Sequence, residues 1–161
     1  TQEEPNVLWN GMLSWLFVQQ KDFRKAFIQE KAIFNRQPES LDGIEELATI
    51  CVGEGAVETA KEIYTFLIDT AQDLETQLSA YQNLLNLKIK ESPKEDYAII
   101  NNEYLEVFKK YGKFSQTLDI QIDYAHFLAF YMNKTAEATR FLEKTLELPL
   151  NQLQKTPKLI R

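Results

Sequence analysis

The chain has 161 residues, of which 44% are hydrophobic and 26% charged, and its formal net charge is −6. This composition suits a globular chain long enough to bury a core, and it does not fit a disordered, collagen-like or membrane-embedded one. The net negative charge would repel the phosphate backbone of a nucleic acid, so we expect no nucleic-acid partner. Five Gly and five Pro leave few tight turns for a many-stranded sheet, which favours long helices.

Apolar residues recur at helical spacing in successive stretches that Pro and Gly residues separate. The longest unbroken apolar run, Trp15 to Val18, is too short to cross a bilayer, so we expect no membrane insertion. Each pair of neighbouring stretches predicts two antiparallel helices joined by a short turn. In chain order the predicted helices lie at about residues 5–20, 23–36, 41–52, 57–71, 74–90, 94–111, 117–131 and 135–148, and a ninth begins after Asn151.

Residues at the predicted helix ends have the chemistry of caps and breakers. Asp22 and Ser40 are placed to cap the helices that follow them. The run Ser92-Pro93-Lys94-Glu95 predicts an N-cap, a proline in the first turn and a capping-box glutamate. Gly53 and Gly112 are placed to end the helices before them.

The helix pairs repeat along the chain. Ala60 follows Ala26 by 34 residues, and Ala138 follows Ala60 by two such periods plus ten residues. We therefore expect one repeat to carry an insertion. The predicted repeats span about residues 5–38, 39–72, 73–112 (the irregular one) and 115–149, and the start of a further helix occupies 150–161.

Ala26 near the start of a second helix, Pro38 twelve residues later, and Leu13, Ser14 and Phe17 in the first helix resemble the tetratricopeptide repeat family. The stretch from Phe17 to Gln29 also resembles large uncharacterised repeat proteins of Bacteroidetes-type bacteria. The family resemblance implies an all-α, right-handed solenoid of antiparallel helix-turn-helix repeats, with about eight to nine helices. We expect a single repeat domain, and because the ends of the chain look like cut points, we expect it to be a fragment of a longer protein. The bacterial resemblance implies export to the periplasm, with the cytoplasm as the alternative.

The residues with chemical reactivity are few. Gly53-Glu54-Gly55 lacks the Lys and Ser or Thr that complete a phosphate-binding loop. The one cysteine, Cys51, is expected to be a small core residue, and the one histidine, His126, to be structural beside Tyr124 or Asp123. We therefore expect no enzymatic activity, no cofactor and no metal.

Charge is unevenly distributed along the chain. Residues 39–72 contain eight Asp or Glu and a single base, Lys61, so this predicted repeat carries a net charge of −7. One explanation of such a cluster is simply a solvated helix face. The family resemblance implies the alternative, because the inner face of its superhelix is lined by fixed positions of the first helices. Carrying those positions over predicts a peptide groove lined by Trp15, Val18, Asp42, Glu45, Thr49, Ser79, Asn83, Asn86, Asp123 and Phe127.

These residues predict a non-catalytic scaffold that binds an extended peptide or a partner protein. Asn side chains can bind peptide backbone groups, and Trp15 can hold an apolar or cationic anchor unless an upstream repeat covers it. The first helices of the first two predicted repeats, at residues 7–20 and 41–52, contain no Lys or Arg, so a basic or neutral peptide is favoured over an acidic one. The alternative is a structural spacer or a self-associating module that forms homo-oligomers. A helical-bundle hydrolase or metal protein is the third class.

Overall fold

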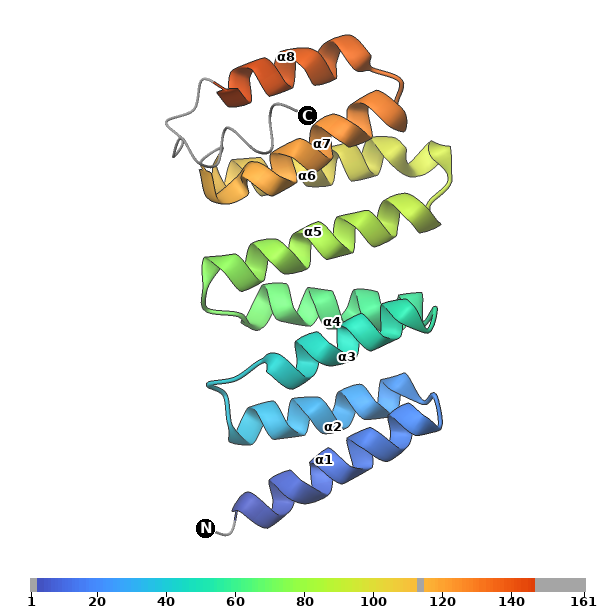
Figure 1. Cartoon of the computed structure of the whole chain (residues 1–161), viewed down its shortest axis with the longest axis vertical. Coiled ribbons are helices and arrows are strands. Elements are labelled where there is room, and N and C mark those ends of the chain that lie inside the picture. The colour runs from blue at the N-terminus through green and yellow to red at the C-terminus, as the bar shows by residue number, and fades with distance from the viewer. Residues whose placement is uncertain (1–2, 113–114, 147–161) are drawn as a thin grey trace. The chain divides into compact units, whose positions relative to one another are not determined.

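The computed structural model describes residues 3–112 and 115–146, and over these residues its regular structure is entirely helical. The all-α prediction is therefore confirmed, and the predicted helix ends agree with the observed ones to within about three residues. The ninth helix predicted after Asn151 lies outside the described residues. The helices are α1 (Glu3–Gln19), α2 (Phe23–Arg36), α3 (Asp42–Gly53), α4 (Val57–Thr70), α5 (Leu74–Glu91), α6 (Tyr97–Tyr111), α7 (Leu118–Phe130) and α8 (Thr135–Leu146), with short 3₁₀ helices η1 (Lys94–Asp96) and η2 (Ser115–Thr117) (Figure 1).

The chain divides into two compact units, residues 1–84 and 85–161, and the division falls within α5. In the first unit α1 packs against α2, α3 packs against α4, and α2 also contacts α3. In the second unit α7 packs against α8 and also contacts α6. Consecutive helices within each unit run antiparallel (Figure 1). Each unit is thus built around helical hairpins. No helix within the described ranges is long and apolar enough to cross a membrane.

Local chemistry explains several of the helix ends. The Asp22 carboxylate accepts a hydrogen bond from the backbone N–H of Lys25 at 3.3 Å, as an N-cap should. Gly55, in the turn after α3, and Gly112, at the end of α6, have φ angles of +79° and +80°. Because a side chain disfavours this left-handed region, glycine ends these two helices at little cost.

Two predicted caps differ from the observed ones. Ser40 does accept a hydrogen bond from the Asp42 N–H at 3.3 Å, but the residue in the N-cap position of α3 is Leu41. The capping box predicted at residues 92–95 is wrong, because α6 begins only at Tyr97, after the 3₁₀ turn η1. Pro93 is extended, with a ψ of 164°, and its carbonyl accepts from the Asp96 N–H at 3.0 Å. This tight turn displaces the start of the α-helix from the residues that would have formed the box.

The two units have different cores. In the first unit, Ala26, Ala48 and Ala60 have no exposed surface, so neighbouring helices can approach closely at these points. The core of the second unit contains a cluster of aromatic rings, with the half-buried Tyr97 and Phe141 at its edge. The rings contact one another at centroid distances of 5.0 to 5.7 Å: Tyr97, Tyr104, Phe108, Tyr124, Phe127 and Phe141.

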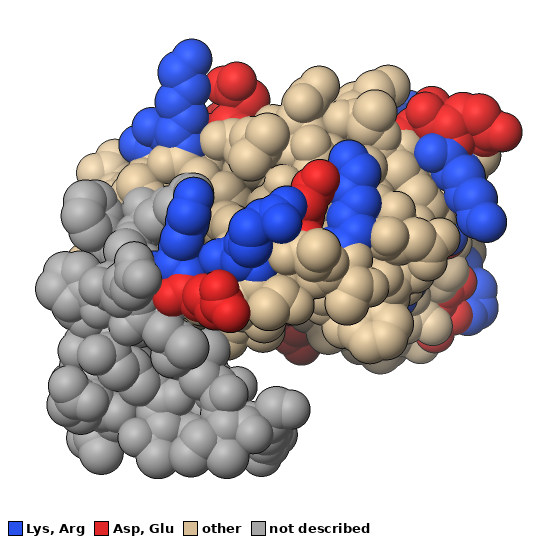
Figure 2. All heavy atoms as spheres, turned by 90° about the horizontal axis from the view of Figure 1, so that it is seen from above, with Lys and Arg blue, Asp and Glu red and all other residues tan. Residues whose placement is uncertain are grey.

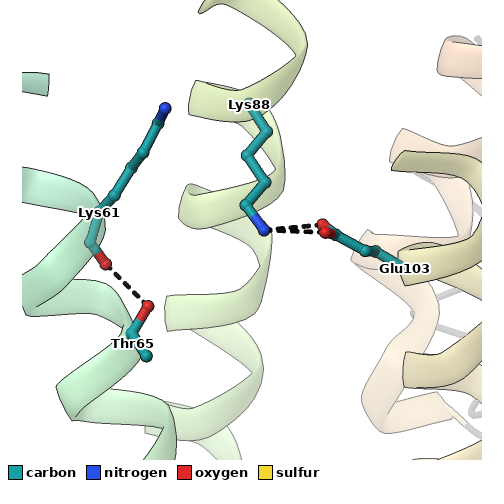
Figure 3. Close-up of polar contacts among 4 residues, drawn as sticks. All are labelled: Lys61, Thr65, Lys88 and Glu103. Atoms are coloured by element: carbon teal, nitrogen blue, oxygen red, sulfur yellow. Dashed lines mark hydrogen bonds and ion pairs between the residues drawn. The ribbon is translucent and has the colours of Figure 1, made fainter. Parts of the chain in front are cut away.

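Polar contacts supplement this packing. The Thr65 hydroxyl donates to the Lys61 carbonyl within α4, and the Lys88 ammonium donates to both carboxylate oxygens of Glu103 at 2.9 Å, which joins α5 to α6 (Figure 3). In the second unit the buried Gln121 amide donates to the Thr117 hydroxyl at 2.7 Å and accepts from the Thr145 hydroxyl at 3.1 Å. This network ties α7 to α8 without leaving these polar atoms unpaired.

Candidate functional site

A hollow of about 200 Å³ in the first unit collects side chains from α3, α4 and α5. We call it the polar hollow; it is lined by Glu45, Thr49, Tyr64, Leu67, Thr76, Ser79, Ala80 and Asn83. Its floor consists of buried residues, since Tyr64, Leu67 and Ala80 are at most 6% exposed. Its walls are the more exposed polar side chains of α3 and α5.

Helical spacing explains why these wall residues share the polar hollow. Glu45 and Thr49 are four residues apart on α3, and Thr76, Ser79 and Asn83 are separated by three and four residues on α5. Residues at these spacings lie on one face of a helix. The Thr49 hydroxyl donates to the Glu45 carbonyl at 3.2 Å, which leaves its oxygen able to accept from a ligand. The amide of Asn83 adds two donors and an acceptor.

A second hollow, of about 660 Å³, adjoins the polar hollow because Glu45 and Thr76 line both. We call it the acidic hollow. Its lining includes four carboxylates, and none of its described lining residues is Lys or Arg. The lining residues are Phe34, Pro38, Glu39, Ser40, Leu41, Asp42, Glu45, Thr70, Gln72, Asp73 and Thr76.

Three other acids of residues 39–72 form ion pairs outside the acidic hollow. Glu54 pairs with Lys21, Glu62 with Arg24, and Glu58 with Lys61 at 3.2 Å. Three of the eight acids therefore meet a cation elsewhere on the surface, while Glu39, Asp42 and Glu45 line the hollow together with Asp73. On the face shown in Figure 2, by contrast, Lys and Arg side chains are interspersed with Asp and Glu.

The carboxylates of the acidic hollow affect one another. Partial burial, followed by the charges of Asp42 and Asp73, raises the pKa of Glu45. Hydrogen bonds from the side chain and the backbone N–H of Thr76 lower the pKa of Asp73; the backbone bond measures 2.8 Å. The ionised form of Asp73 is therefore favoured, whereas burial and the neighbouring charges disfavour the ionised form of Glu45. A bound cation would relieve this repulsion.

The structure brings some of the predicted groove residues together and separates others. Glu45, Thr49, Ser79 and Asn83 line the polar hollow, and Asp42 lines the acidic one. Trp15 and Val18 lie on α1, which contributes no residue to either hollow. Asn86 and Asp123 line a hollow of about 350 Å³ in the second unit, together with Ile89, Lys90, His126 and Tyr131.

The prediction that Phe127 lines a groove is wrong. Its side chain has no exposed surface, and its ring lies 5.7 Å from that of Tyr97 and 5.6 Å from that of Tyr104. The exposed aromatic residue at this end of α7 is Phe130, of which 71% is exposed. The position carried over from the family thus falls on the core side of α7, which is apolar on most of its sides.

Sequence reasoning missed the floor of the polar hollow and part of the acidic hollow. Tyr64 and Leu67 belong to the second helix of a pair, whereas the predicted groove is lined by first helices alone. Asp73 also escaped notice, although an Asp three residues before Thr76 is the signature of an N-cap. That signal places the Asp73 carboxylate at the start of α5.

The two most reactive residue types occupy different environments. Cys51 is fully buried, as predicted, and burial raises the pKa of its thiol to about 11. It is therefore a neutral thiol at physiological pH. His126 is exposed on α7, with its ring 4.5 Å from the ring of Phe130 and 6.2 Å from that of Tyr131. Within the described ranges, no three or more His, Cys, Asp or Glu residues are grouped so that they could hold a metal ion.

In comparisons with known proteins, no family model and no curated protein matches this chain. The resemblance to tetratricopeptide repeats therefore stays a prediction. A function has to be inferred from the two hollows of the first unit and the chemistry of their linings.

Proposed function

We propose that this chain is a non-catalytic protein-interaction module that binds an extended peptide carrying a Lys or Arg side chain. The observation that carries the proposal is the joint lining of the polar hollow by α3 and α5, above a buried floor and beside four carboxylates. Under this proposal the helical hairpins are tetratricopeptide-like repeats of a solenoid. Its first helices, α3 and α5 among them, line the side that faces the partner.

The two hollows have complementary tasks. In the polar hollow, Asn83 can donate to a peptide carbonyl and accept from a peptide N–H, which recognises backbone without regard to sequence. In the acidic hollow, Asp42, Glu45 and Asp73 attract an ammonium or guanidinium group and disfavour an acidic side chain. Glu45 lines both hollows and therefore has the largest expected effect on binding.

Selection from a displayed library of ten-residue peptides, with Arg, Gln or Glu fixed at the central position, tests the proposal. We expect the wild-type chain to enrich the Arg library and Glu45→Lys to lose at least tenfold in affinity for the selected peptides. Asn83→Ala should weaken binding of all selected sequences to a similar degree. Glu46→Lys is the matched control, because Glu46 is exposed on the same helix and lines neither hollow.

Two results would contradict the proposal: equal losses in Glu45→Lys and Glu46→Lys, or no enrichment of any peptide by the wild-type chain. Equal losses would mean that only the net charge matters. An absence of enrichment would favour the alternative function, a structural spacer or self-associating module whose surface takes no peptide. Circular dichroism of each variant shows whether its helices are intact.

A further inference from the structure

Helix α1 exposes a continuous apolar surface, which we call the α1 face. The side of α1 toward α2 is partly polar: Ser14 is only 5% exposed, and the Asn10 amide donates to the Gln29 side chain at 2.7 Å. A surface helix of a globular protein normally has the opposite arrangement, with its large apolar residues turned inward. The α1 face consists of Leu8, Trp9, Met12, Leu13, Trp15 and Leu16, which are 69%, 66%, 61%, 37%, 62% and 42% exposed.

The area of the α1 face is what a stable dimer requires. Scaled by their exposed fractions, the six side chains present roughly 550 Å² of apolar surface, taking about 250 Å² for an indole and about 120 Å² for Leu or Met. A standard interface covers about 800 Å² per partner, of which about 65% is apolar in homodimers, or about 500 Å². The α1 face alone supplies this amount.

The α1 face is also symmetric about Met12. Trp9 and Trp15 lie three residues before and after Met12, and Leu8 and Leu16 lie four residues before and after it. At about 100° per residue, these five side chains form a stripe roughly 120° wide that is centred on Met12. A two-fold axis that passes between two antiparallel helices at the level of Met12, at right angles to both, therefore brings Trp9 of one copy to the level of Trp15 of the other. The same axis sets Leu8 next to Leu16.

Charge does not oppose such a pairing. The chain has a net charge of −6, yet residues 6–19 contain no Asp, Glu, Lys or Arg. Two α1 faces can therefore meet without burying a charge or placing like charges in contact. A surface of this kind offers little to a charged partner, whereas a second copy of the same face shares its apolar, uncharged character.

We propose that two copies of this chain associate through their α1 faces, with the two α1 helices antiparallel around a two-fold axis at Met12. The interface is isologous, so each copy contributes the same six residues. It uses none of the residues that line the polar or acidic hollow. The proposed dimer and the proposed peptide-binding function can therefore be tested independently of each other.

The oligomeric state and the tryptophan fluorescence of the intact chain test this proposal together. Trp9 and Trp15 are the chain's two tryptophans, so its indole emission reports only on the α1 face. With increasing concentration we expect the mass to rise from 18.8 kDa to twice that value and the emission to move to shorter wavelength. Met12→Glu places two carboxylates on the two-fold axis and should abolish both changes. Ile28→Glu, on an exposed site of α2, is the matched control and should leave both intact.

Single cysteines test the orientation of the helices, because Cys51 is fully buried and does not compete. Residue 12 faces its own copy across the axis, so Met12→Cys should form an intermolecular disulfide under mild oxidation. Residue 8 lies about 6 Å along the helix from the axis and thus about 12 Å from its copy, beyond the reach of a disulfide of about 7 Å between Cα atoms. Leu8→Cys should therefore remain reduced.

Three results would overturn the proposal. A monomeric mass at several hundred micromolar would show that the α1 face does not pair. A short-wavelength emission at every concentration, with a monomeric mass, would mean that the chain itself covers the face. Efficient cross-linking of both cysteine variants would indicate parallel helices and contradict the two-fold arrangement at Met12.

Discussion

Phe127 provides the sharpest test of the packing in the second unit, because the groove interpretation and the structure make opposite predictions for it. Its side chain has no exposed surface and contacts the rings of Tyr97, Tyr104 and Tyr131 at 5.6 to 6.1 Å. Truncation to alanine removes a buried ring and leaves a cavity, which in well-packed cores costs about 3–5 kcal/mol. Because three aromatic contacts are lost as well, we expect a value near the upper end of that range.

The control for Phe127→Ala is Phe130→Ala, the same substitution one helical turn further along α7. Phe130 is 71% exposed, so its removal should change the free energy of unfolding by less than about 0.5 kcal/mol. Urea unfolding followed by circular dichroism at 222 nm measures both values. A groove-lining Phe127 would show the small effect and lose peptide binding instead. Equal destabilisation by the two substitutions, or a loss below about 1 kcal/mol in Phe127→Ala, would refute the core assignment.

Three further substitutions or reactions test other parts of the structure. Glu45→Gln should raise the free energy of unfolding at pH 7 by a few tenths of a kcal/mol, because the pKa of Glu45 is raised in the fold and its ionised form opposes folding. Thermal melts should show this gain disappearing below about pH 4, where the carboxyl is protonated in the unfolded chain as well. Thr145→Val should lower the free energy of unfolding, measured in urea, by about 1–2 kcal/mol because the buried Gln121 carbonyl loses a donor. Thr139→Val loses only an exposed hydrogen bond to the backbone and should cost less than about 0.5 kcal/mol. Equal costs would contradict the buried network. Cys51 should react with a thiol reagent at pH 8 only as fast as the chain unfolds, because its thiol is buried and has a pKa of about 11; rapid labelling of the folded chain would contradict this burial.

The sequence by itself determined where the helices begin and end, because these features depend on residues close together in the chain. The signals that predict the helices act within a turn or two of the backbone, as the apolar periodicity, the Asp22 carboxylate and Gly112 do. The structure confirms the helices they predict. The cap predicted at Ser40 and the capping box before α6 were the exceptions. Before α6, local chemistry offered two outcomes, and the extended conformation of Pro93 favoured a 3₁₀ turn over a cap on Ser92.

Only the tertiary structure decided which sides of α1 and α7 are buried. On α7 and α1, apolar residues occupy so many sides that periodicity cannot select the inner one. Packing buries Phe127 and leaves Phe130 exposed, and it turns Ser14 inward while Trp15 remains outside. The polar hollow likewise depends on α3 and α5, whose lining residues are about 30 positions apart in the sequence, and most of its floor comes from α4. A local pattern specifies a helix, but the neighbours that cover one of its faces are distant in sequence, so only the folded arrangement determines which surface is left for a partner.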